Sequence, residues 1–355
     1  MTHRWLHART VLALLLGIPL TVASTAATAD AAAARAATAS PAHGAGRGPV
    51  YAPYFETWTK DTLPAVARAS GARALTLAFL QTPARGSCSL TWNGTKKQPV
   101  KPGGRYTAQI RTLRAMGGDA IPSFGGFSAD QGGTEIADSC RSVPAIARAY
   151  ESVVTTYGVT RLDMDVEANS LGNKAGIARR SAALRLLQDW AARTHRHVRI
   201  TFTLGVEPWG LPATCLAILK SAVAHGVRFS VNIMAFDYYI KASQSGIEMG
   251  TAAIQALHGT HRQLGRLYPG LSQPRLWGLE GITLLPGIDD YPKKTEVTYL
   301  RDAREVAGFA RAHRLPLLSI WAIQRANGGC PGSIDSNSCS GIHQSRWAFS
   351  HLLES

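Results

Sequence analysis

The chain has 355 residues, of which 45% are hydrophobic and 8% aromatic, and its formal net charge is +15. The Lys and Arg residues are scattered, with no basic block and no interleaved aromatic residues, which argues against a nucleic-acid-binding protein. We expect either a basic surface without a dedicated role or one that adheres to anionic cell-wall polymers.

The first residues have the pattern of an export signal. Arg4 and Arg9 form a positive start. The apolar run Val11–Val22 is short for a membrane span, and the small residues Ala23–Ala29 follow it. We therefore predict a secretory signal peptide over residues 1–29 and a secreted, extracellular protein. An uncleaved membrane anchor is the alternative.

The remaining chain divides into a spacer and one domain. Residues 30–47 are mostly Ala, with Thr, Ser, Pro and Gly and no periodic apolar face, which predicts a disordered spacer. Residues 48–355 suit one large domain with a single core. They contain no second stretch apolar enough to cross a membrane. We expect a monomer that binds neither nucleic acid nor, once the signal is removed, a membrane.

Short apolar runs alternate with longer helical patterns along this domain. The candidate strands are Val50–Phe55, Ala74–Phe79, Ala120–Phe124, Arg161–Glu167, Val198–Leu204, Phe229–Phe236, Leu276–Ile282 and Leu315–Trp321. The candidate helices are Arg105–Met116, Val143–Tyr157, Lys174–Thr194, Leu211–Ala224, Thr251–Leu267, Glu296–His313 and His343–Leu353.

Eight strands that alternate with helices predict an α/β fold with a parallel sheet. Their number points to a single-domain (β/α)8 TIM barrel, whose active site lies at the carboxyl ends of the strands. A doubly wound sheet is the alternative. It would be favoured by a Gly-rich phosphate loop after the first strand, but Tyr54–Trp58 stands there instead.

The five cysteines suggest a disulfide framework, as an exported protein permits. Cys330 and Cys339 flank a loop rich in Pro, Gly, Ser and Asn and are expected to pair. Cys88 and Cys140 lie in two other loop segments and are the candidate second pair, although sequence alone does not fix connectivity. Cys215 lies in an apolar helical stretch and is expected to be a buried free thiol. No Cys/His spacing indicates a metal site.

Acidic residues alternate with apolar ones in the segment Arg161–Glu167. On a strand, Asp163, Asp165 and Glu167 share one face, while the apolar residues between them pack outward. Three carboxyl groups facing a barrel interior repel one another and lose solvation, so at least one pKa is expected to rise. A carboxylic acid with a raised pKa is what a glycosidase needs to protonate a leaving group.

Two other interpretations fit the acidic residues less well. An acidic edge strand facing water would not normally be so apolar on its other face within a βα series. A calcium loop would require Gly turns and irregular spacing. We therefore predict a catalytic site here.

This segment resembles the signature of glycoside hydrolase family 18, the chitinases, D-G-x-D-x-D-x-E at the end of the fourth barrel strand. The last three acidic positions match, whereas Thr160 and Arg161 replace the usual Asp and Gly. Ser123–Gly126 resembles the family's S-x-G-G segment on the third strand, and Met234–Tyr238 resembles M-x-Y-D-Y on the sixth. Trp321 resembles the Trp that forms the floor of the sugar site on the eighth strand.

Two further segments resemble one branch of bacterial and archaeal chitinases. They are Tyr51–Tyr54 on the first strand and Trp321–Gly328 near the end. The resemblance implies a sugar site that also includes Tyr54, Gly126 and Gln324. Glu56 is a candidate hydrogen-bond acceptor for sugar, or an exposed turn carboxylate.

The resemblance implies substrate-assisted catalysis. Glu167 would protonate the glycosidic oxygen, and the substrate's own N-acetyl oxygen would attack the anomeric carbon. Asp165 would orient the N-acetyl group, and Asp163 would share a proton with Asp165. Asp237 would support the N-acetyl group or the attacking water. The product would retain its anomeric configuration.

The sixth-strand segment departs from the family at Phe236, where Tyr is commoner. Phe cannot donate the hydrogen bond that the Tyr hydroxyl makes to the acetamido oxygen. Tyr238 is a possible substitute, but on a regular strand it lies on the face of Phe236 two residues further along. The alternative is that this branch places its donor elsewhere. Met234 completes the expected set of sugar-binding residues.

The groove is expected to be open. The segment between Ile282 and Leu315 is too short for the extra α+β domain that some relatives insert between strands seven and eight, which predicts an endo-acting chitinase. Four tryptophans near segment ends can either stack on sugars or pack in the core, namely Trp58, Trp92, Trp209 and Trp277.

Other functions remain possible on the same pattern. A non-catalytic chitin-binding lectin would usually lose the acid at Glu167. A hydrolase of peptidoglycan or of N-glycan chitobiose would keep it. No motif indicates a metal, a nucleotide or another cofactor, and chitin or N-acetylglucosamine oligosaccharides are the expected ligands.

Overall fold

A computed structural model describes residues 48–239, 248–290, 296–334 and 337–355. The predicted signal peptide, residues 1–29, and the predicted spacer, residues 30–47, lie outside the described residues, so both stay predictions. None of the described helices is long and apolar enough to cross a membrane.

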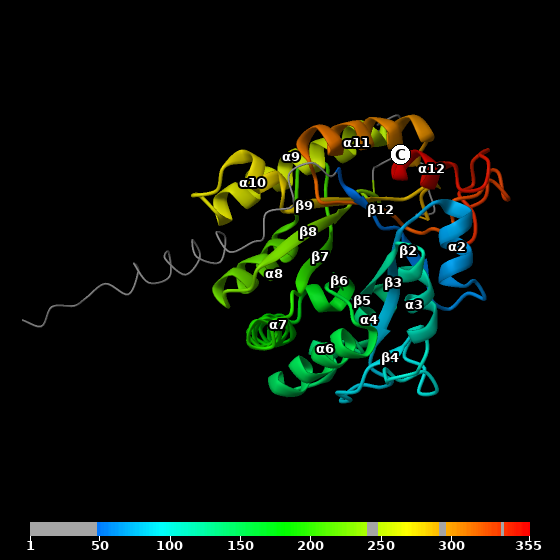
Figure 1. The fold of residues 1–355 in the computed structure, drawn as a ribbon. Helices are drawn as coiled ribbons and strands as arrows, with labels where there is room; N and C mark the ends of the chain where they lie inside the picture. Colours follow the sequence, from blue (N-terminus) through cyan, green and yellow to red (C-terminus); the bar gives the residue numbers. More distant parts are fainter. Residues whose placement is uncertain (1–47, 240–247, 291–295, 335–336) are drawn as a thin grey trace, which may run out of the picture.

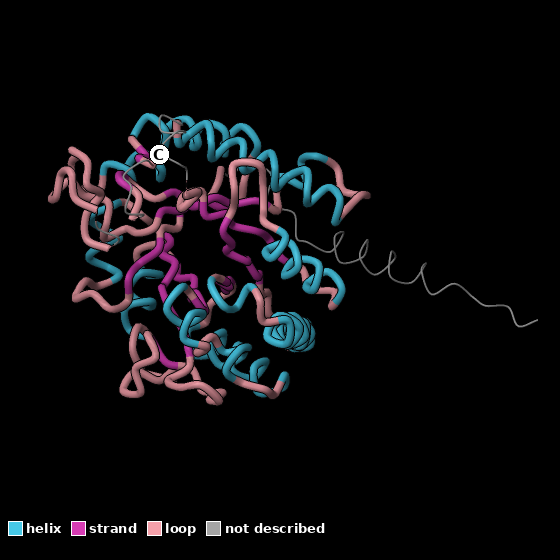
Figure 2. Tube along the Cα trace, turned by 180° about the vertical axis from the view of Figure 1, so that it is seen from behind, coloured by secondary structure: helices cyan, strands magenta, loops and turns pink. Residues whose placement is uncertain are grey.

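The central sheet closes into a ring that helices surround (Figures 1 and 2). Its strands are β1 (Val50–Tyr51), β2 (Tyr54–Glu56), β3 (Ala74–Gln81), β5 (Asp119–Gly125), β6 (Arg161–Val166), β7 (Arg199–Gly205), β8 (Phe229–Met234), β9 (Glu280–Leu284) and β12 (Leu317–Ile320). The order is β1-β12-β9-β8-β7-β6-β5-β3-β2, and neighbouring strands in it are parallel.

The ring closes because β1 and β2 are two parts of one extended segment. Only Ala52 and Pro53 separate them, while β1 pairs with β12 and β2 pairs with β3. Pro53 has no N–H to donate, which explains the interruption, although its carbonyl still accepts a hydrogen bond from Thr76. The predicted (β/α)8 barrel is therefore confirmed.

The helices pack outside the ring (Figure 1). The longer ones are α2 (Leu63–Ser70), α3 (Thr107–Ala115), α6 (Val143–Tyr157), α7 (Lys174–Arg193), α8 (Ala213–Ala224), α9 (Met249–Leu267), α11 (Leu300–His313) and α12 (Ala348–Glu354). Short helices are α4 (Phe127–Gly132), α5 (Ile136–Ser139), α10 (Gln273–Trp277) and the 3-10 turn η1 (Ala168–Leu171). The bounds predicted for α6 are confirmed, since Ser142 caps its first turn and Gly158 ends it in a left-handed conformation.

Several predicted strands differ from the observed bounds, and the sixth and seventh show why. The seventh was placed at Leu276–Ile282, but Leu276 and Trp277 end α10, and β9 begins at Glu280. A short apolar run does not by itself distinguish a strand from a buried helical turn. The sixth was extended to Phe236, but β8 ends at Met234.

Two predicted helices begin four or five residues too early. The helix predicted over Glu296–His313 begins at Leu300, because the Asp302 carboxylate accepts the backbone N–H of Tyr299 at 2.7 Å and fixes the first turn there. The helix predicted over His343–Leu353 begins at Ala348.

The segment between β9 and β12 has no large inserted domain in its described part. It holds α11 and a small antiparallel pair, β10 (Gly287–Ile288) and β11 (Val297–Thr298). A further short strand, β4 (Thr91–Trp92), pairs antiparallel with β3.

The disulfide predictions are confirmed. Cys88 pairs with Cys140, and Cys330 pairs with Cys339. Cys215 is free and buried in α8, as expected. The first bridge ties the loop after β3 to the end of α5, so it fixes two loops at the mouth of the barrel.

Candidate active site

The predicted acidic residues lie together at the carboxyl end of β6. Asp163 and Asp165 are each 3% exposed, and Glu167 follows the strand at its open end, half-buried. The parallel register places Asp163 beside Ser123 on β5 and Asp165 beside Thr203 on β7. The strand alternation inferred from the sequence therefore does direct these carboxyl groups into the barrel.

Asp163 is surrounded by hydroxyl donors. Its Oδ2 accepts hydrogen bonds from Ser123 Oγ at 2.6 Å and Tyr54 Oη at 2.9 Å, and its Oδ1 accepts one from Thr203 Oγ1 at 2.6 Å. Burial raises the pKa of Asp163, but these three hydrogen bonds oppose the increase. Tyr54, expected to be a sugar-binding residue, is buried beneath the site and holds Asp163 in place.

Asp165 and Glu167 have fewer stabilising contacts. Burial raises the pKa of Asp165 well above its usual range, and the charges of Glu167 and Asp163 add to the increase. Burial also raises the pKa of Glu167 to about 7, against a hydrogen bond from the Phe127 backbone N–H. The arrangement thus favours a proton on Asp165 and a protonated fraction of Glu167 near neutral pH.

Asp130, on α4, supports the backbone of Glu167. Its Oδ2 accepts the N–H of Glu167 at 2.5 Å, while its Oδ1 is buried without a hydrogen-bond partner. Burial raises the pKa of Asp130 well above its usual range. Asp130 also lines a hollow of about 350 Å³ whose rim includes Arg85, Arg141 and Asn169.

Aromatic rings line the other side of the mouth. The ring of Trp321, at the end of β12, lies 5.6 Å from that of Phe79, and the two planes differ by 13°. Trp58 is 46% exposed and lies 6.2 Å from Trp321, while Tyr54 lies beneath at 5.5 Å. These rings form a platform of the kind on which sugar faces stack.

The double glycine before α4 is explained by close contacts. A Cβ on Gly125 would lie 2.2 Å from the carbonyl oxygen of Asp165, and one on Gly126 would lie 2.6 Å from the ring of Phe79. Both residues also have positive φ, 93° and 81°. Gly126 therefore lets the aromatic platform and the acidic strand approach each other.

A second group of carboxyl groups lies at the mouth beyond β8. Carboxylate oxygens of Asp237, Asp289 and Asp290 all lie within 4.8 Å of one another. Burial and a hydrogen bond to Asp289 raise the pKa of Asp237 to about 9. The negative charge of Asp290 also raises the pKa of Glu167, so the two acidic groups interact. Such a cluster can share protons or hold a cation, and the shared proton accounts for the Asp237–Asp289 contact.

The residues around Asp237 are not arranged as a regular strand. Asp237 has φ 53°, so the chain leaves β8 before Phe236 and does not continue its alternation. Phe236 is 8% exposed and Tyr238 is 6% exposed. The Tyr238 hydroxyl is buried and has no hydrogen-bond partner among the described residues. Met234 lies half-buried at the end of β8.

Glu56 and Gln324 lie together where the first and last strands meet. Gln324 Oε1 accepts the backbone N–H of Glu56 at 3.1 Å, and its Nε2 donates to Thr59 Oγ1 at 3.2 Å. Glu56 is fully buried, which excludes the exposed turn carboxylate that the sequence left open. Gln324 thereby fixes the loop that carries Trp58.

The four tryptophans offered as stacking candidates fall into two groups. Trp92 is fully buried and donates to Tyr157 Oη at 2.9 Å, and Trp277 is buried against His261, so both pack in the core. Trp58 belongs to the aromatic platform. Trp209 is 70% exposed on the loop between β7 and α8.

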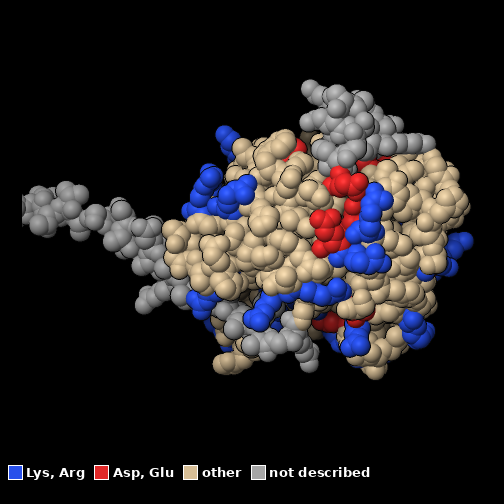
Figure 3. Space-filling view, turned by 90° about the horizontal axis from the view of Figure 1, so that it is seen from above, with Lys and Arg blue, Asp and Glu red and all other residues tan. Residues whose placement is uncertain are grey.

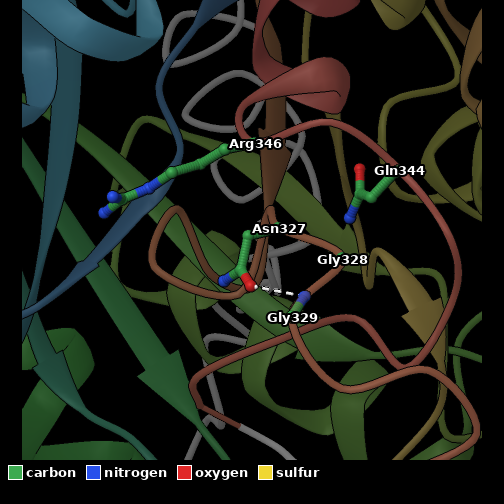
Figure 4. A pocket seen from close by; sticks show the side chains of 5 residues that line it. All are labelled: Asn327, Gly328, Gly329, Gln344 and Arg346. Atoms are coloured by element: carbon green, nitrogen blue, oxygen red, sulfur yellow. Dashed lines mark hydrogen bonds between the residues drawn. The ribbon is translucent and has the colours of Figure 1, made fainter.

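A hollow of about 400 Å³ follows β12 but contains no carboxylate (Figure 4). It is lined by Asn327, Gly328, Gly329, Gln344 and Arg346. Asn327 Oδ1 accepts the N–H of Gly329 at 2.9 Å there, which shapes the loop. The acidic residues therefore lie in the barrel mouth and outside this hollow.

The surface charge is mixed on the face over α9 and α11 (Figure 3). Acidic and basic side chains lie side by side there, as in the ion pair of Arg301 with Glu248 at 3.0 Å. In the described part of this face, acidic side chains have basic neighbours, in keeping with the scattered basic residues of the sequence (Figure 3).

Sequence reasoning missed several residues of this site. They are Phe79, Ser123 as a donor, Asp130, Thr203, Asp289 and Asp290. The paired aspartates follow a predicted strand end and were detectable in principle. The hydroxyl donors were not, because Ser and Thr on strands are common and only the register shows which carboxylate they contact.

Comparisons with known proteins agree with this geometry. The chain is 31% identical over 314 residues to a probable bifunctional chitinase/lysozyme of Escherichia coli, an alignment that covers 86% of this chain and 34% of the relative. It is also 31% identical over 285 residues to endochitinase 11 of Metarhizium anisopliae, covering 78% of this chain and 52% of the relative. The chain thus spans about a third and about half of these relatives' lengths.

A solved structure covers nearly the same region. The catalytic domain of a hyperthermophilic chitinase from Pyrococcus furiosus matches with a TM-score of 0.72 and 27% identity, covering 86% of this chain and 94% of that one. A family 18 chitinase from Cycas revoluta in complex with (GlcNAc)3 shares the fold at 11% identity and a TM-score of 0.53, covering 86% and 98%. No protein-family model matches the chain. Together with the acidic strand and the closed barrel, these similarities support a chitinase-like protein of the glycoside hydrolase family 18 type.

Proposed function

We propose that this barrel is a chitinase that hydrolyses β-1,4 bonds between N-acetylglucosamine residues. The observation that carries the proposal is the pair Asp165 and Glu167 on one strand face, with the pKa of Glu167 raised to about 7 by burial. A carboxyl group with that pKa can give a proton and take it back near neutral pH. The named relatives, which are chitinases, support the same activity.

In the proposed mechanism Glu167 donates its proton to the glycosidic oxygen as the bond from that oxygen to the anomeric carbon breaks. The substrate's acetamido oxygen attacks the same carbon and forms an oxazolinium ion. Water then attacks the anomeric carbon from the opposite face as its bond to the acetamido oxygen breaks, and the water gives a proton to Glu167. Two successive inversions retain the configuration. The nucleophile comes from the substrate, so no second carboxylate nucleophile is needed.

Asp165 and Asp163 support the acetamido group during this step. Asp165 is buried and has a raised pKa, so it begins protonated; once its proton has passed to Asp163, its carboxylate can accept the acetamido N–H and stabilise the positive charge that develops on that nitrogen. Asp163, held by Tyr54, Ser123 and Thr203, can take up the shared proton. Substrates without a 2-acetamido group at the cleaved sugar would therefore react poorly.

The lack of a large inserted domain in the described part of the segment between β9 and β12 supports endo-type cleavage. The described part of the segment between β9 and β12 holds a small hairpin and one helix where a walled cleft would need an inserted domain. The Trp321–Phe79 platform would take the face of the sugar on the non-reducing side of the cleaved bond. A chain can then enter the groove along its length.

We also propose that the protein acts outside the cytoplasm. The two disulfides support this, because such bridges persist in oxidising compartments. Mass spectrometry of the protein recovered from the culture medium would test it, with a mature chain that begins near Asp30 as the expected result.

The decisive experiment compares the wild-type protein with Glu167→Gln on colloidal chitin and N-acetylglucosamine oligomers. We expect cleavage with retained configuration in the wild type, and a loss of ~10³-fold or more in the variant, because the acid is removed. Binding without cleavage in both proteins would support a lectin instead. Cleavage of peptidoglycan or of N-glycan chitobiose, but not of chitin, would reassign the substrate.

A further inference from the structure

Three arginines that are far apart in the sequence, Arg161, Arg199 and Arg228, are brought together by the sheet. Arg161 and Arg199 are the first residues of β6 and β7, and the strand register pairs them. Arg228 directly precedes β8, whose first residue, Phe229, pairs with Ile200. Because neighbouring strands lie roughly 5 Å apart, the three residues stand side by side at the amino end of the barrel. We call them the arginine cluster.

Strand alternation directs the side chains of the arginine cluster toward the inside of the barrel. Thr203 marks the inner face, because its Oγ1 donates to Asp163 at 2.6 Å and accepts from Asn232 Nδ2 at 3.0 Å. The first arginine lies two residues before Asp163, the second four before Thr203, and the third four before Asn232. Side chains an even number of residues apart on a strand share a face, so the cluster faces inward.

Two hydroxyl groups lie next to the arginine cluster on the same inner face. Thr201 on β7 and Ser230 on β8 follow the arginines of their strands by two residues, and their side-chain oxygens are 3.0 Å apart. Both residues are only half-buried, whereas Thr203 and Asn232, two residues further in, are buried. The inner face is therefore accessible from the amino end as far as these hydroxyl groups.

The positive charge of the arginine cluster is not neutralised by neighbouring carboxylates. Within the described residues, its guanidinium groups form no ion pair, and Asp119, which begins β5, is paired with Arg114 at 3.0 Å. Burial lowers the pKa of Arg161; the charge of Asp119 opposes this decrease, and that of Arg199 adds to it. Like charges on adjacent strands repel one another, and a bound anion would offset that repulsion.

The donors of this surface suit a phosphate group. A guanidinium group presents its N–H donors in a planar fork that binds two oxygens of a phosphate or a carboxylate. A carboxylate has only two oxygens, whereas a phosphate group carries acceptor oxygens in several directions and can contact donors from more than one strand. The hydroxyl groups of Thr201 and Ser230 can donate to the same oxygens.

We propose that the arginine cluster, together with Thr201 and Ser230, is a phosphate-binding site at the amino end of the barrel. The ligand is a phosphate group, either free in solution or carried by a polymer. Arg161 stands where the family signature has Gly, so this departure from the signature supplies one of the three guanidinium groups. The site lies at the opposite end of the strands from Glu167 and does not depend on the chitinase function proposed above.

The test compares two double variants that lose the same charge. Arg199→Gln with Arg228→Gln changes the arginine cluster, whereas Arg266→Gln with Arg304→Gln changes exposed residues of the outer helices α9 and α11. Calorimetry at low ionic strength would titrate each protein with inorganic phosphate, acetate and poly(glycerol phosphate). We expect the wild type and the control to bind phosphate alike, and the cluster variant to bind it ~10-fold or more weakly, because charge-assisted hydrogen bonds are lost.

The probes distinguish the source of the phosphate group. Binding of inorganic phosphate and of the polymer would support a site for the phosphate group itself, and binding of the polymer alone, weakened only in the cluster variant, would support a polymer-borne phosphate. Equal weakening in both double variants, binding of neither phosphate probe, or tighter binding of acetate than of phosphate would overturn the proposal.

A conservative variant guards against a loss of folding. Arg199→Lys with Arg228→Lys keeps both charges but removes the planar fork, so its affinity for phosphate should lie between those of the wild type and the Gln variant. Cleavage of the N-acetylglucosamine tetramer at the wild-type rate would show that each variant is folded. A Lys variant that binds phosphate as tightly as the wild type would contradict recognition by the guanidinium groups.

Discussion

Carboxyl groups are buried at both ends of this barrel, but their surroundings differ. At the carboxyl ends of the strands, Glu167 lies among other acids. At the amino ends, Glu280 begins β9 and contacts His261 Nδ1 at 2.7 Å. Burial raises the pKa of Glu167 and of Glu280 to about 7 in each case. Two carboxyl groups therefore have the same raised pKa, although Glu167 lies where it can transfer a proton to a ligand and Glu280 lies in a packed part of the core.

The partners explain the difference. His261 also contacts Gln273 through Nε2 at 2.6 Å and stacks on Trp277 with ring centres 3.7 Å apart. That buried cluster leaves no room for a substrate. Glu167 is surrounded by carboxylates and by the exposed aromatic platform, and among the described residues it has no histidine partner as Glu280 has. A bound sugar can therefore supply the hydrogen-bonding group that contacts Glu167. A raised pKa therefore marks a catalytic group only where the surroundings are accessible.

The sharpest test of this comparison is Asp165→Asn beside Glu280→Gln. We expect Asp165→Asn to lower kcat ~10²- to 10³-fold, because the acetamido group loses a charged support in the transition state. Glu280→Gln should leave kcat within about 2-fold, since the residue is remote from the carboxyl ends of the strands. Initial rates on the N-acetylglucosamine tetramer would measure both. An equal decrease in kcat for both variants would contradict the view that only the carboxyl ends of the strands take part in catalysis.

A second prediction concerns stability. His261→Ala removes the partner of a buried carboxylate and a ring packed on Trp277, and should lower the free energy of unfolding by about 3 kcal/mol. Urea denaturation at neutral pH would measure it. Tyr239→Phe, on the open face, is the control and should change it by less than about 0.5 kcal/mol. A stable His261→Ala variant would contradict the structural role.

The pH dependence of stability gives a third prediction. Burial lowers the pKa of His261, but its hydrogen bonds to Glu280 and Gln273 outweigh this and raise it overall. The native state therefore binds protons more tightly than the unfolded chain at both His261 and Glu280. Stability from Glu280 is complete below its usual value of 4.5 and is lost as pH rises toward about 7.

The measurement for this prediction is the urea midpoint of the wild type and of Glu280→Gln at several pH values. The advantage of the wild type over the variant should shrink as pH rises from about 4.5 to about 7. An advantage that grows with pH would mean that the ionised pair, and not the proton, stabilises this end of the barrel.

The smallest expected effect lies in the pH profile of catalysis. Glu167 must be protonated to act as an acid, so kcat/KM should fall as pH rises above about 7. Asp290→Asn removes a charge that raises the pKa of Glu167, so the falling limb should move to lower pH by less than about one unit. Asp189→Asn, on the outer helix α7, is the control. If the falling limb of the pH profile does not move, the charge of Asp290 has no effect on the pKa of Glu167.

The sequence by itself determined the strands, the barrel and the acidic face. Period-two alternation from Arg161 to Glu167 sufficed to place Asp163, Asp165 and Glu167 on one side of β6, because strand geometry is local. The apolar runs and helical periods likewise determined the α/β order, and the loop composition suggested the cysteine pairs without fixing their connectivity.

Only the tertiary structure decided how the site is completed. The hydroxyl donors to Asp163 come from strands far apart in the chain. The Asp130 carboxylate, which accepts the backbone N–H of Glu167, lies on a short helix that the apolar periodicity of the sequence did not predict. The burial of Tyr238 and the exposure of Tyr239 likewise depend on left-handed backbone conformations at Asp237 and Tyr239 and on the buried carboxylates that accept the backbone N–H groups of Asp237 and Tyr238. Hydrogen bonds between segments far apart in the chain do not affect the apolar periodicity of the sequence. These contacts can therefore be identified only from the folded barrel.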